Sequence, residues 1–471
     1  MTRYSKSSID MTGGPIVKGL LLFAIPIMLT GMLQLLFNAA DTVVVGRFGS
    51  ETAIGAVGST TALITLIVNL FMGLSVGASV TTAYCYGAKD SEGVHQVVHT
   101  SILSAAIAGI LVGIIGFFVS TPALRLMEAP DNVIGQSATY MKIYFCGTPA
   151  MMVYNFGASI VRSSGDTKRP LYYLSISGVV NIILNLIFVI VFHLDVAGVA
   201  IATVISQFIS AACILVHMLR CDKWYKLEIR KLRIYPEKLL KIIRIGVPAG
   251  LQSSVFSISN VVVQSSINSF GSIAVNGNAA AASLEGFMYL SVNAFHQSAV
   301  SFTGQNIGAK KYHRTGSIMK AALALAAAVS IVMGGVFLLF REELLHIYIP
   351  AYMPNSQAAV AYGVQRLIII CSTYYLCSGN DVMTGVLRGM GTSLVPALIS
   401  VIGVCGTRIL WVLLIFPSFH TITSLYISYP VSWFISFAAQ IICFIFVKRR
   451  LQKQMENIER KQKTPPAEET A

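Results

Sequence analysis

The amino-acid sequence predicts an all-α polytopic membrane protein of about twelve transmembrane helices, arranged as two homologous six-helix lobes with a central cavity. Three observations lead to this fold class: a composition poor in charge, a series of long apolar segments, and an internal repeat. Of the 471 residues, 55% are hydrophobic and 11% are charged, and the mean hydropathy is +0.71. Because a soluble chain carries about 25% charged residues, this composition indicates a protein that crosses a membrane many times.

The apolar segments are each about 20 residues or longer, which is the length of helix that spans a bilayer. The short stretches between them hold most of the charged residues. The expected spans are 16–45, 53–79, 94–119, 136–161, 170–193, 197–219, 241–269, 274–303, 317–340, 358–387, 395–417 and 422–447.

The loops between these segments alternate in charge. The two ends of the chain and the even-numbered loops carry most of the basic residues, whereas the odd-numbered loops carry Arg47, Arg125 and Arg341 and little else. By the positive-inside rule, both termini are expected in the cytoplasm, on a multi-pass protein of the inner (cytoplasmic) membrane. A net charge of +14 would suggest nucleic acid as the partner of a soluble protein. Here anionic lipids are a sufficient partner for the basic loops, and no nucleic acid is expected.

The second half of the chain repeats motifs of the first. The matched pairs are FGS at 48–50 and 270–272, YGAKD at 86–90 and IGAKK at 307–311, and VRSSGDTKRP at 161–170 and LRGMGTSLVP at 387–396. Their offsets are 222 (270 − 48), 221 (307 − 86) and 226 (387 − 161) residues. Six helices in each half give both halves the same topology, so the halves are parallel repeats, which usually bind substrate between them.

This repeat divides the chain into four parts. We predict an N-lobe at 1–225, a basic cytoplasmic linker at 226–240 and a C-lobe at 241–450. The last part, 451–471, is polar and contains a proline pair, so we expect it to be a disordered cytoplasmic tail.

Three acidic residues lie well inside apolar segments: Asp41, Glu285 and Asp381. A charged carboxylate at the bilayer centre costs about 2.5 kcal/mol or more, so such a residue usually faces a cavity, has a partner or is protonated. Arg408, in the middle of the eleventh segment, could neutralise Asp381. Alternatively, Glu285 and Asp381 line the central cavity and attract a cation.

Asp41 is expected to have polar neighbours in the first half. Asn185 and Thr203 lie at a similar depth, on the order of 10 Å from the outer surface. Asn181 shares a helix face with Asn185. Such a chamber can hold a proton on Asp41, or a sodium ion among oxygen atoms. The same groups could instead form a buried network that only fixes helix packing.

Further candidates come from helix faces and helix breaks. Asn38 and Gln34 precede Asp41 by three and seven residues and lie on its face. Pro26 and Pro248 interrupt the first and seventh segments at matching repeat positions, as static bends or as hinges. The candidates for a soft cavity wall that accepts planar ligands are Met288, Tyr289, Tyr154 and Tyr375.

Enzyme signatures are absent from the sequence. It contains no GxxxxGK[ST], GxSxG or HExxH motif, and its eight cysteines and eight histidines show no metal-ligand spacing. We therefore expect no enzymatic activity, no cofactor and no resident metal. Without a nucleotide-binding loop, this chain alone cannot couple to ATP, so pumping must use an ion gradient or a separate subunit.

Several motifs resemble the multidrug and toxic compound extrusion (MATE) family. They are IP at 25–26 with FNAADTVVVGRFG at 37–49, YGAKD, RSSGDTKRP with its echo LRGMGTSLVP, and NIILN at 181–185. The resemblance covers residues 15–450. It implies an antiporter that exports amphipathic, often cationic, drugs or metabolites by rocking-bundle alternating access, driven by inward proton or sodium flow. We expect it to act as a monomer.

By position, this resemblance makes Asp41 the coupling carboxylate and Pro26 the bend of the first helix. It places Asn181, Asn185 and Thr203 in one chamber. Several bacterial relatives have an acid at the position of Asn185. Because a single carboxylate suits one proton, proton coupling is expected, with sodium at Asp41 as the alternative.

Two further comparisons bear on the site and the substrate. Some relatives have tyrosine in place of Asn38, and another branch uses C-lobe acids, of which this chain retains Asp381 as a secondary candidate. The alternative function is a flippase or exporter of lipid-linked sugars from the same wider superfamily. It would favour more helices, often about fourteen, and cationic residues in the cavity. A membrane-embedded enzyme is the third interpretation and lacks paired catalytic groups.

Overall fold

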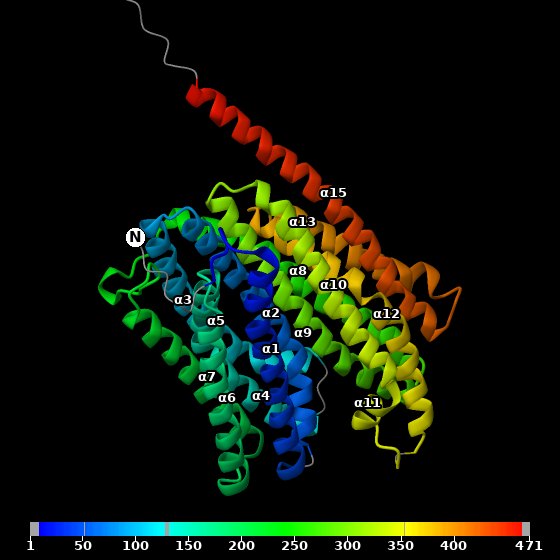
Figure 1. Cartoon of the computed structure of the whole chain (residues 1–471). Helices are drawn as coiled ribbons and strands as arrows, with labels where there is room; N and C mark the ends of the chain where they lie inside the picture. Colours follow the sequence, from blue (N-terminus) through cyan, green and yellow to red (C-terminus); the bar gives the residue numbers. More distant parts are fainter. Residues whose placement is uncertain (1–8, 51, 128–130, 353, 464–471) are drawn as a thin grey trace, which may run out of the picture.

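The computed structural model describes residues 9–50, 52–127, 131–352 and 354–463, and every regular element in them is a helix (Figure 1). The longer helices are α1 (Ile16–Phe48), α2 (Ala53–Gly87), α3 (Ser91–Leu126), α6 (Lys168–Leu186), α7 (Asp195–Arg220), α8 (Pro236–Asn268), α9 (Ser272–Gly308), α10 (His313–Leu339), α12 (Ser356–Gly389) and α15 (Ile422–Lys463). The shorter elements are α4 (Asp131–Cys146), α5 (Thr148–Ser163), α11 (Arg341–Tyr348), α13 (Leu394–Ser400), α14 (Thr407–Leu410), the π-helical turns η1 (Ile187–Val191), η3 (Val401–Gly406) and η4 (Trp411–Ile415), and the 3-10 turn η2 (Ile229–Lys231).

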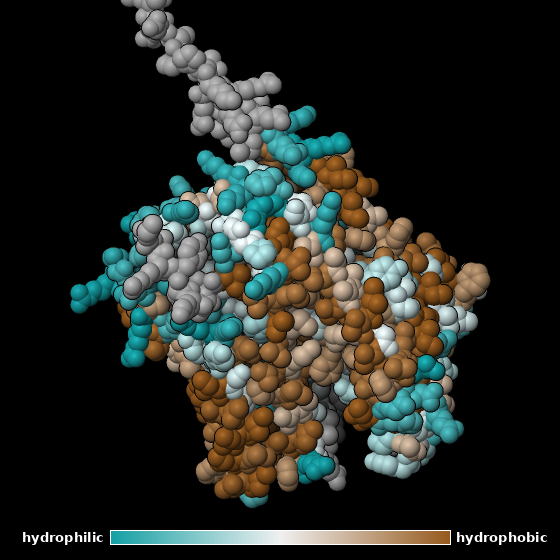
Figure 2. Space-filling view, in the orientation of Figure 1, coloured by the Kyte–Doolittle hydropathy of each residue, from teal (hydrophilic) through white to brown (hydrophobic). Residues whose placement is uncertain are grey.

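Ten helical segments of the described residues are long and apolar enough to cross a membrane. Two further predicted spans are also helical: α4 and α5, separated at Gly147, form the fourth, and the more polar α9 forms the eighth. The all-α, multi-pass fold is therefore confirmed. Figure 2 shows a broad apolar surface, with hydrophilic side chains gathered toward the end of the molecule where Figure 1 marks the N-terminus.

Two of the three repeated motif pairs adopt the same backbone turns in both halves. Gly165 and Gly391 have positive φ values of 100° and 84°, a conformation that favours glycine, and each N–H closes the turn on the carbonyl three residues earlier at 2.8 Å. The lysines of the other motif, Lys89 and Lys310, have φ values of 57° and 56°. The third pair, FGS, differs, since Gly49 has a φ of −86° and Gly271 a φ of +86°. Sequence repetition is thus reproduced as repetition of local structure in two of the three pairs.

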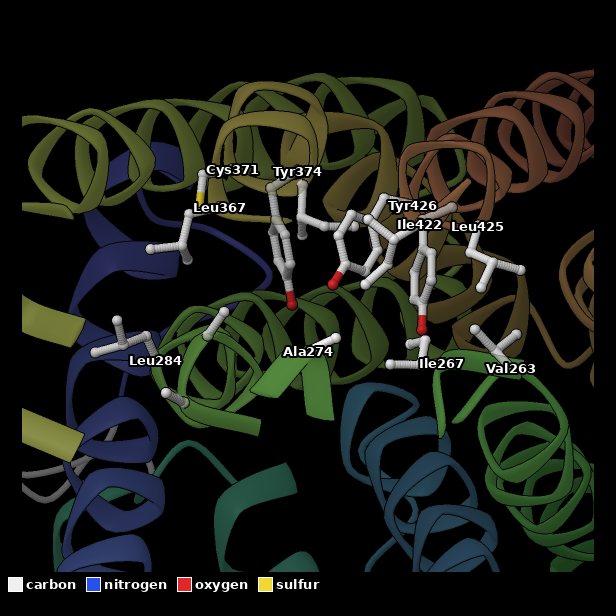
Figure 3. Close-up of a cluster of buried hydrophobic side chains, with 14 of the residues drawn as sticks. Val263, Ile267, Ala274, Leu284, Leu367, Cys371, Tyr374, Ile422, Leu425 and Tyr426 are labelled. Carbon is white, nitrogen blue, oxygen red and sulfur yellow. The ribbon is translucent and has the colours of Figure 1, made fainter. Parts of the chain in front are cut away.

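Each half has its own apolar core. In the first half, α3, α5 and α7 enclose a cluster that includes Phe156, Ile160 and Ile214. In the second half, α9, α12 and α15 enclose a cluster that includes Leu367 and Tyr426 (Figure 3). A further apolar cluster joins the halves, with Leu20 and Phe23 of α1 packed with Phe302 of α9 and Val386 of α12.

The halves contact each other from the middle of the helices to the end that carries the N-terminus. There α2 and α8 meet backbone to backbone, since a Cβ added to Gly73 would lie 2.1 Å from the Gly250 nitrogen. Further hydrogen bonds at this end join the main chain around Met11–Gly14 to α9 and to the start of α10. At the opposite end, Figure 2 shows a cleft between the two halves.

Two predicted boundaries differ from the structure. α8 begins at Pro236, inside the predicted linker 226–240, because proline is well suited to the first turn of a helix. The expectation of a disordered tail from residue 451 is wrong for 451–463, where α15 continues to Lys463. Residues 464–471 lie outside the described residues.

Candidate functional site

Asp41 belongs to a hydrogen-bonded chain of polar side chains in the first half. From α6, the Asn185 amide nitrogen donates to the Asp41 carboxylate and lies 3.4 Å from Asn181 Oδ1. The Asn181 amide nitrogen in turn lies 3.5 Å from Thr203 Oγ1 on α7. The structure therefore brings together the four residues that the sequence predicted to share a chamber.

This chamber contains one acid and no paired cation. No ion pair of Asp41 is found among the described residues. Asn185 is fully buried, and its Oδ1 has no hydrogen-bond partner there. A buried oxygen without a donor is an acceptor that a proton-bearing group could use. The arrangement can hold a proton, or a small cation if the amide rotates.

The helix that carries both asparagines changes its winding beside the site. α6 ends at Leu186, one residue after Asn185, and continues as the π-helical turn η1. Such turns are rare and often occur at functional sites. The local widening lies beside the Asn185 side chain that reaches Asp41.

Two expected members of the chamber lie outside its bonded chain. Asn38 and Gln34 are exposed, and neither donates to Asp41 in the part of the chain that the structure describes. The Asn38 carbonyl accepts a hydrogen bond from Thr42 at 3.0 Å. Spacing on a helix gives a shared face, but an adjacent helix decides which residues on that face are enclosed.

The second half has no counterpart of this acid. At the offset of 222 residues, Asp41 corresponds to Val263 (41 + 222), which is fully buried in the C-lobe core. The bonded chain is therefore a property of the N-lobe alone.

The two prolines occupy interior positions of long, continuous helices. Pro26 is buried in α1, and its carbonyl accepts a hydrogen bond from Thr30 Oγ1 at 2.7 Å. Pro248 is half-buried in α8, two residues from the Gly250 contact with α2. Each proline lacks the N–H of a regular helical bond, so both remain candidate hinges.

Glu285 forms an ion pair that the sequence analysis missed. Its two carboxylate oxygens each accept a 2.7 Å hydrogen bond from Arg366 of α12, whose third nitrogen donates to Asn278. Arg366 also lies over the Tyr426 and Tyr429 rings, at 5.6 and 5.2 Å. A lone arginine in the apolar run GVQRLIII was the signal that could have revealed it.

The pairing of Arg408 with Asp381, one of the two alternatives from the sequence, is not found among the described residues. Arg408 lies 4.0 Å from the Tyr429 ring centroid, and it donates to Asn260 and Ser432 at 3.2 Å each. The aromatic face and neutral acceptors take the place of a carboxylate. The π-helical turns η3 and η4 flank this arginine and are not readable from the sequence.

Asp381 is partly exposed and has no ion pair within 4.0 Å among the described residues. Its own backbone carbonyl lies 2.7 Å from His296 Nδ1. Arg388, two helical turns later, is occupied by Gln252 at 2.7 Å and by His296 at 3.4 Å. Asp381 is thus the less neutralised of the two C-lobe acids.

The proposed cavity wall divides into exposed and buried side chains. Tyr289 and Tyr375 are 49% and 43% exposed. Met288 is buried against Cys371, and Tyr154 is buried with its hydroxyl bonded to the Pro170 carbonyl, so neither can line a cavity in this conformation. The exposed tyrosines remain candidates.

Comparison with known proteins identifies the family. The MatE profile matches residues 26–187 and 248–414, one match in each half, which together cover well over half of the chain. The chain belongs to the MatE family. The MATE resemblance is therefore confirmed, and as a MatE protein the chain is a multi-pass membrane transporter and not an enzyme.

Two MatE relatives and one solved structure show the extent of the similarity. The chain is 29% identical over 399 residues to "Probable multidrug resistance protein YoeA" of Bacillus subtilis, covering 82% of this chain and 84% of the relative. It is 22% identical to "Multidrug export protein MepA" of Staphylococcus saprophyticus, covering 88% and 94%. Its fold is similar to that of "a multidrug resistance MATE family transporter of the MOP superfamily" in an outward-facing conformation, with TM-score 0.86, 20% identity, and 97% and 100% coverage.

Proposed function

We propose that this MatE chain is a cation-coupled antiporter that exports amphipathic, often cationic, drugs or metabolites, with Asp41 as the coupling carboxylate. The observation that carries the proposal is the bonded chain from Asp41 to Thr203, which joins a membrane-embedded acid to neutral groups only. A carboxylate without a cationic partner can change its charge during a transport cycle. The names of YoeA and MepA support drug-like substrates.

Within this proposal the coupling ion is a proton, with sodium as the alternative. A proton needs one basic oxygen, whereas sodium needs several oxygen ligands at once. Asn185 turns its NH2 group toward Asp41, and such a donor repels a cation. Sodium would therefore require the Asn185 amide to turn over, so that its unpartnered Oδ1 faces the carboxylate.

The orientation proposed from the basic loops makes this conformation outward-facing. With both termini in the cytoplasm, the contacts between the halves close the cytoplasmic side, and the cleft of Figure 2 opens outward. Arg162 of α5 contributes to that closure by donating to Gln297 of α9 at 2.9 Å, and Gln305 donates to the Ser163 carbonyl at 2.7 Å. These bonds must break before the halves open to the cytoplasm.

The cycle begins with a proton entering the open cleft and binding Asp41. Protonation removes the negative charge of Asp41, so its hydrogen bond from the Asn185 amide becomes weaker. As a result α1 repacks about Pro26, and bound substrate leaves to the outside. The empty site then closes outward and opens inward, where Asp41 loses its proton and new substrate enters. Exchange results because proton and substrate favour different conformations and each weakens the binding of the other.

We expect the substrate to contact the two exposed tyrosines and the acid without an ion pair. Tyr289 and Tyr375 present aromatic faces to a planar cation. Asp381 supplies the attracting charge, since it has no ion pair in the described residues, whereas the charge of Glu285 is taken up by Arg366. Export of cationic compounds is the consequence.

One observation favours the flippase alternative, and another disfavours it: the second half holds buried arginines, but these already have partners. Three buried arginines lie in the second half among the residues whose burial the structure describes, more intramembrane cations than the sequence indicated. The three are Arg366, Arg388 and Arg408. All are at most 6% exposed and already hold acceptors or aromatic rings, so they are not available to a diphosphate in the cleft.

The test is efflux of a fluorescent cationic dye from proteoliposomes under an imposed pH gradient or, separately, an imposed sodium gradient. The pH gradient alone should drive dye movement in the wild type, and Asp41→Asn should abolish it. Asp222→Asn is the matched control, because that side chain is 97% exposed outside the spans.

Drive by sodium alone would replace the proton by sodium as the coupling ion. Normal transport by Asp41→Asn under either gradient would show that the coupling site is elsewhere, with Asp381 next to be tested. Absence of any dye movement by the reconstituted wild type under both gradients would contradict the antiporter assignment for this dye class.

A further inference from the structure

A basic cavity lies outside the transport pathway, at the end of the molecule that carries the N-terminus. It has a volume of about 780 Å³ and is lined by the first turns of α3 and by the segment that connects the two halves. None of its residues belongs to the bonded chain from Asp41 to Thr203, and it lies at the end of the molecule opposite the cleft. In the orientation proposed above, this end faces the cytoplasm.

Charge around the cavity is strongly positive. Five basic side chains face two acidic ones, Glu92 and Glu228, which leaves three positive charges in excess (5 − 2). The basic residues are Lys223, Lys226, Arg230, Lys231 and Arg233. Glu228 is already bound by Lys231 at 2.9 Å, so the acidic charge is partly compensated within the wall.

The floor holds a histidine with no hydrogen-bond partner. His99 is occupied: its Nδ1 lies 2.7 Å from the His95 carbonyl, and its Nε2 accepts from the Glu228 N–H at 3.0 Å. His95 stacks on His99 at 3.9 Å, but both His95 ring nitrogens are buried without partners in the described residues. Glu228 Oε1 approaches His95 Nε2 only to 3.7 Å. Buried polar atoms of this kind normally have a partner.

Lys223 also lacks a hydrogen-bond partner among the described residues. Its ammonium nitrogen is buried, lies 5.6 Å from the Tyr225 ring centroid, and has no acceptor among the residues that the structure describes. Burial lowers the pKa of Lys223, and a bound anion would favour its charged form. Asp166 is a carboxylate that acts on Lys223, but it is already bound by Arg169 at 2.8 Å. An acceptor-rich anion would supply both unpartnered groups with acceptors.

We propose that this cavity binds a phosphate group, with Lys223 and His95 donating from the floor and Arg230 and Arg233 from the rim. A phosphate supplies several acceptor oxygens and a charge that matches the excess. A divalent metal ion is disfavoured, since the described residues contain no group of three metal-ligating side chains. The inference does not depend on the proposed transport cycle.

The phosphate can belong to an anionic lipid or to a soluble compound. Basic segments next to a membrane attract anionic headgroups. Trp224 and Tyr235 also line the cavity, and such aromatic residues are enriched at the membrane interface. Free inorganic phosphate or a phosphate monoester would satisfy the same donors, so the experiment must separate the two sources.

The experiment measures the thermal unfolding midpoint of the full chain in phosphatidylcholine nanodiscs. One series replaces increasing fractions of the lipid by phosphatidylglycerol, and a second adds inorganic phosphate or glycerol phosphate to the buffer. The variants are Lys223→Met at the floor and Arg230→Gln at the exposed rim. Arg449→Gln, an exposed basic residue of α15, is the charge-matched control.

The phosphate-containing probe should stabilise the wild type and Arg449→Gln with the same apparent affinity. Both cavity variants should bind the probe about tenfold more weakly, as expected for loss of a charged hydrogen bond. Response to phosphatidylglycerol alone identifies a lipid, and response to the soluble compounds alone identifies a soluble ligand. Equal responses of all variants, or no stabilisation of the wild type by any probe, would overturn the proposal. If Lys223→Met does not fold, the exposed Arg230→Gln decides the result.

Discussion

At the residue scale, two membrane-embedded acids have opposite surroundings. Glu285 accepts two hydrogen bonds from one edge of the Arg366 guanidinium group, whereas Asp41 accepts one from a neutral amide. The first arrangement keeps a charge in place, and the second permits the charge to change. Position in an apolar segment singled out both acids equally, so the partner alone separates a structural acid from a candidate coupling acid.

Glu285→Gln should strongly destabilise the protein, because it leaves the buried Arg366 without its counter-charge. The expected loss is about 3–5 kcal/mol in the free energy of unfolding. The double variant with Arg366→Met should recover most of it, since no buried charge then remains. Chemical unfolding in detergent micelles measures each value.

The control is Glu343→Gln on α11, an exposed acid whose loss should change stability by about 0.5 kcal/mol or less. An unfolding midpoint of Glu285→Gln equal to that of the wild type would refute a stabilising role for the pair.

Element-scale packing depends on a series of amides along α8. Gln252 accepts from Arg388, Asn260 accepts from Arg408, and Gln264 accepts from the Asn278 side chain. The sequence shows three amides in an apolar segment but does not show which residues they bind. Two of these amides thereby serve as acceptors for the buried side chains of Arg388 and Arg408 in the C-lobe.

α8 also meets α2 at a close approach between the halves. Gly73→Ala should lower the free energy of unfolding by about 1–3 kcal/mol, because the new Cβ would lie 2.1 Å from the Gly250 nitrogen and force the helices apart. Thermal unfolding in micelles is the measurement.

Gly58→Ala, in the same helix, is the matched control. A Cβ there meets no heavy atom within 4 Å, so the substitution should leave stability unchanged or raise it by up to about 1 kcal/mol. Equal effects of the two substitutions would contradict the close packing of α2 on α8.

The whole molecule is closed on one side by contacts between its halves. Arg162→Leu removes the donor to Gln297 and, in the proposed orientation, should shift the population toward the inward-facing conformation by about tenfold, the effect of one charged hydrogen bond. Spin labels at the exposed positions of Lys168 and Arg449 should then report an added population at longer distances across the cytoplasmic side.

Gln297→Leu should produce the same shift, because it removes the other partner of the bond. Lys320→Gln, which changes an exposed basic residue of α10, should leave the distances unchanged. A distance distribution that none of the three substitutions alters would mean that this bond does not control closure.

The sequence by itself determined the membrane class and the internal repeat, and it named the four residues of the bonded chain at Asp41 together with Asn38 and Gln34, which lie outside that chain. These depend on properties that are local in the chain: hydropathy over about 20 residues, matched motifs, and polar groups at equal depth in neighbouring helices. The same local reasoning identified Tyr289 and Tyr375 but could not exclude Met288 and Tyr154, since burial depends on distant helices.

Only the tertiary structure decided which charges meet and which side of the molecule is closed. Arg366 and Glu285 form an ion pair although they are 81 residues apart in the chain. The sequence permitted a pair between Arg408 and Asp381, but in the structure Arg408 lies over the Tyr429 ring. Ion pairing and cation–aromatic contact depend on distances of a few ångströms between helices far apart in the sequence. Those distances are set by packing of the whole molecule, which no linear pattern in this chain records.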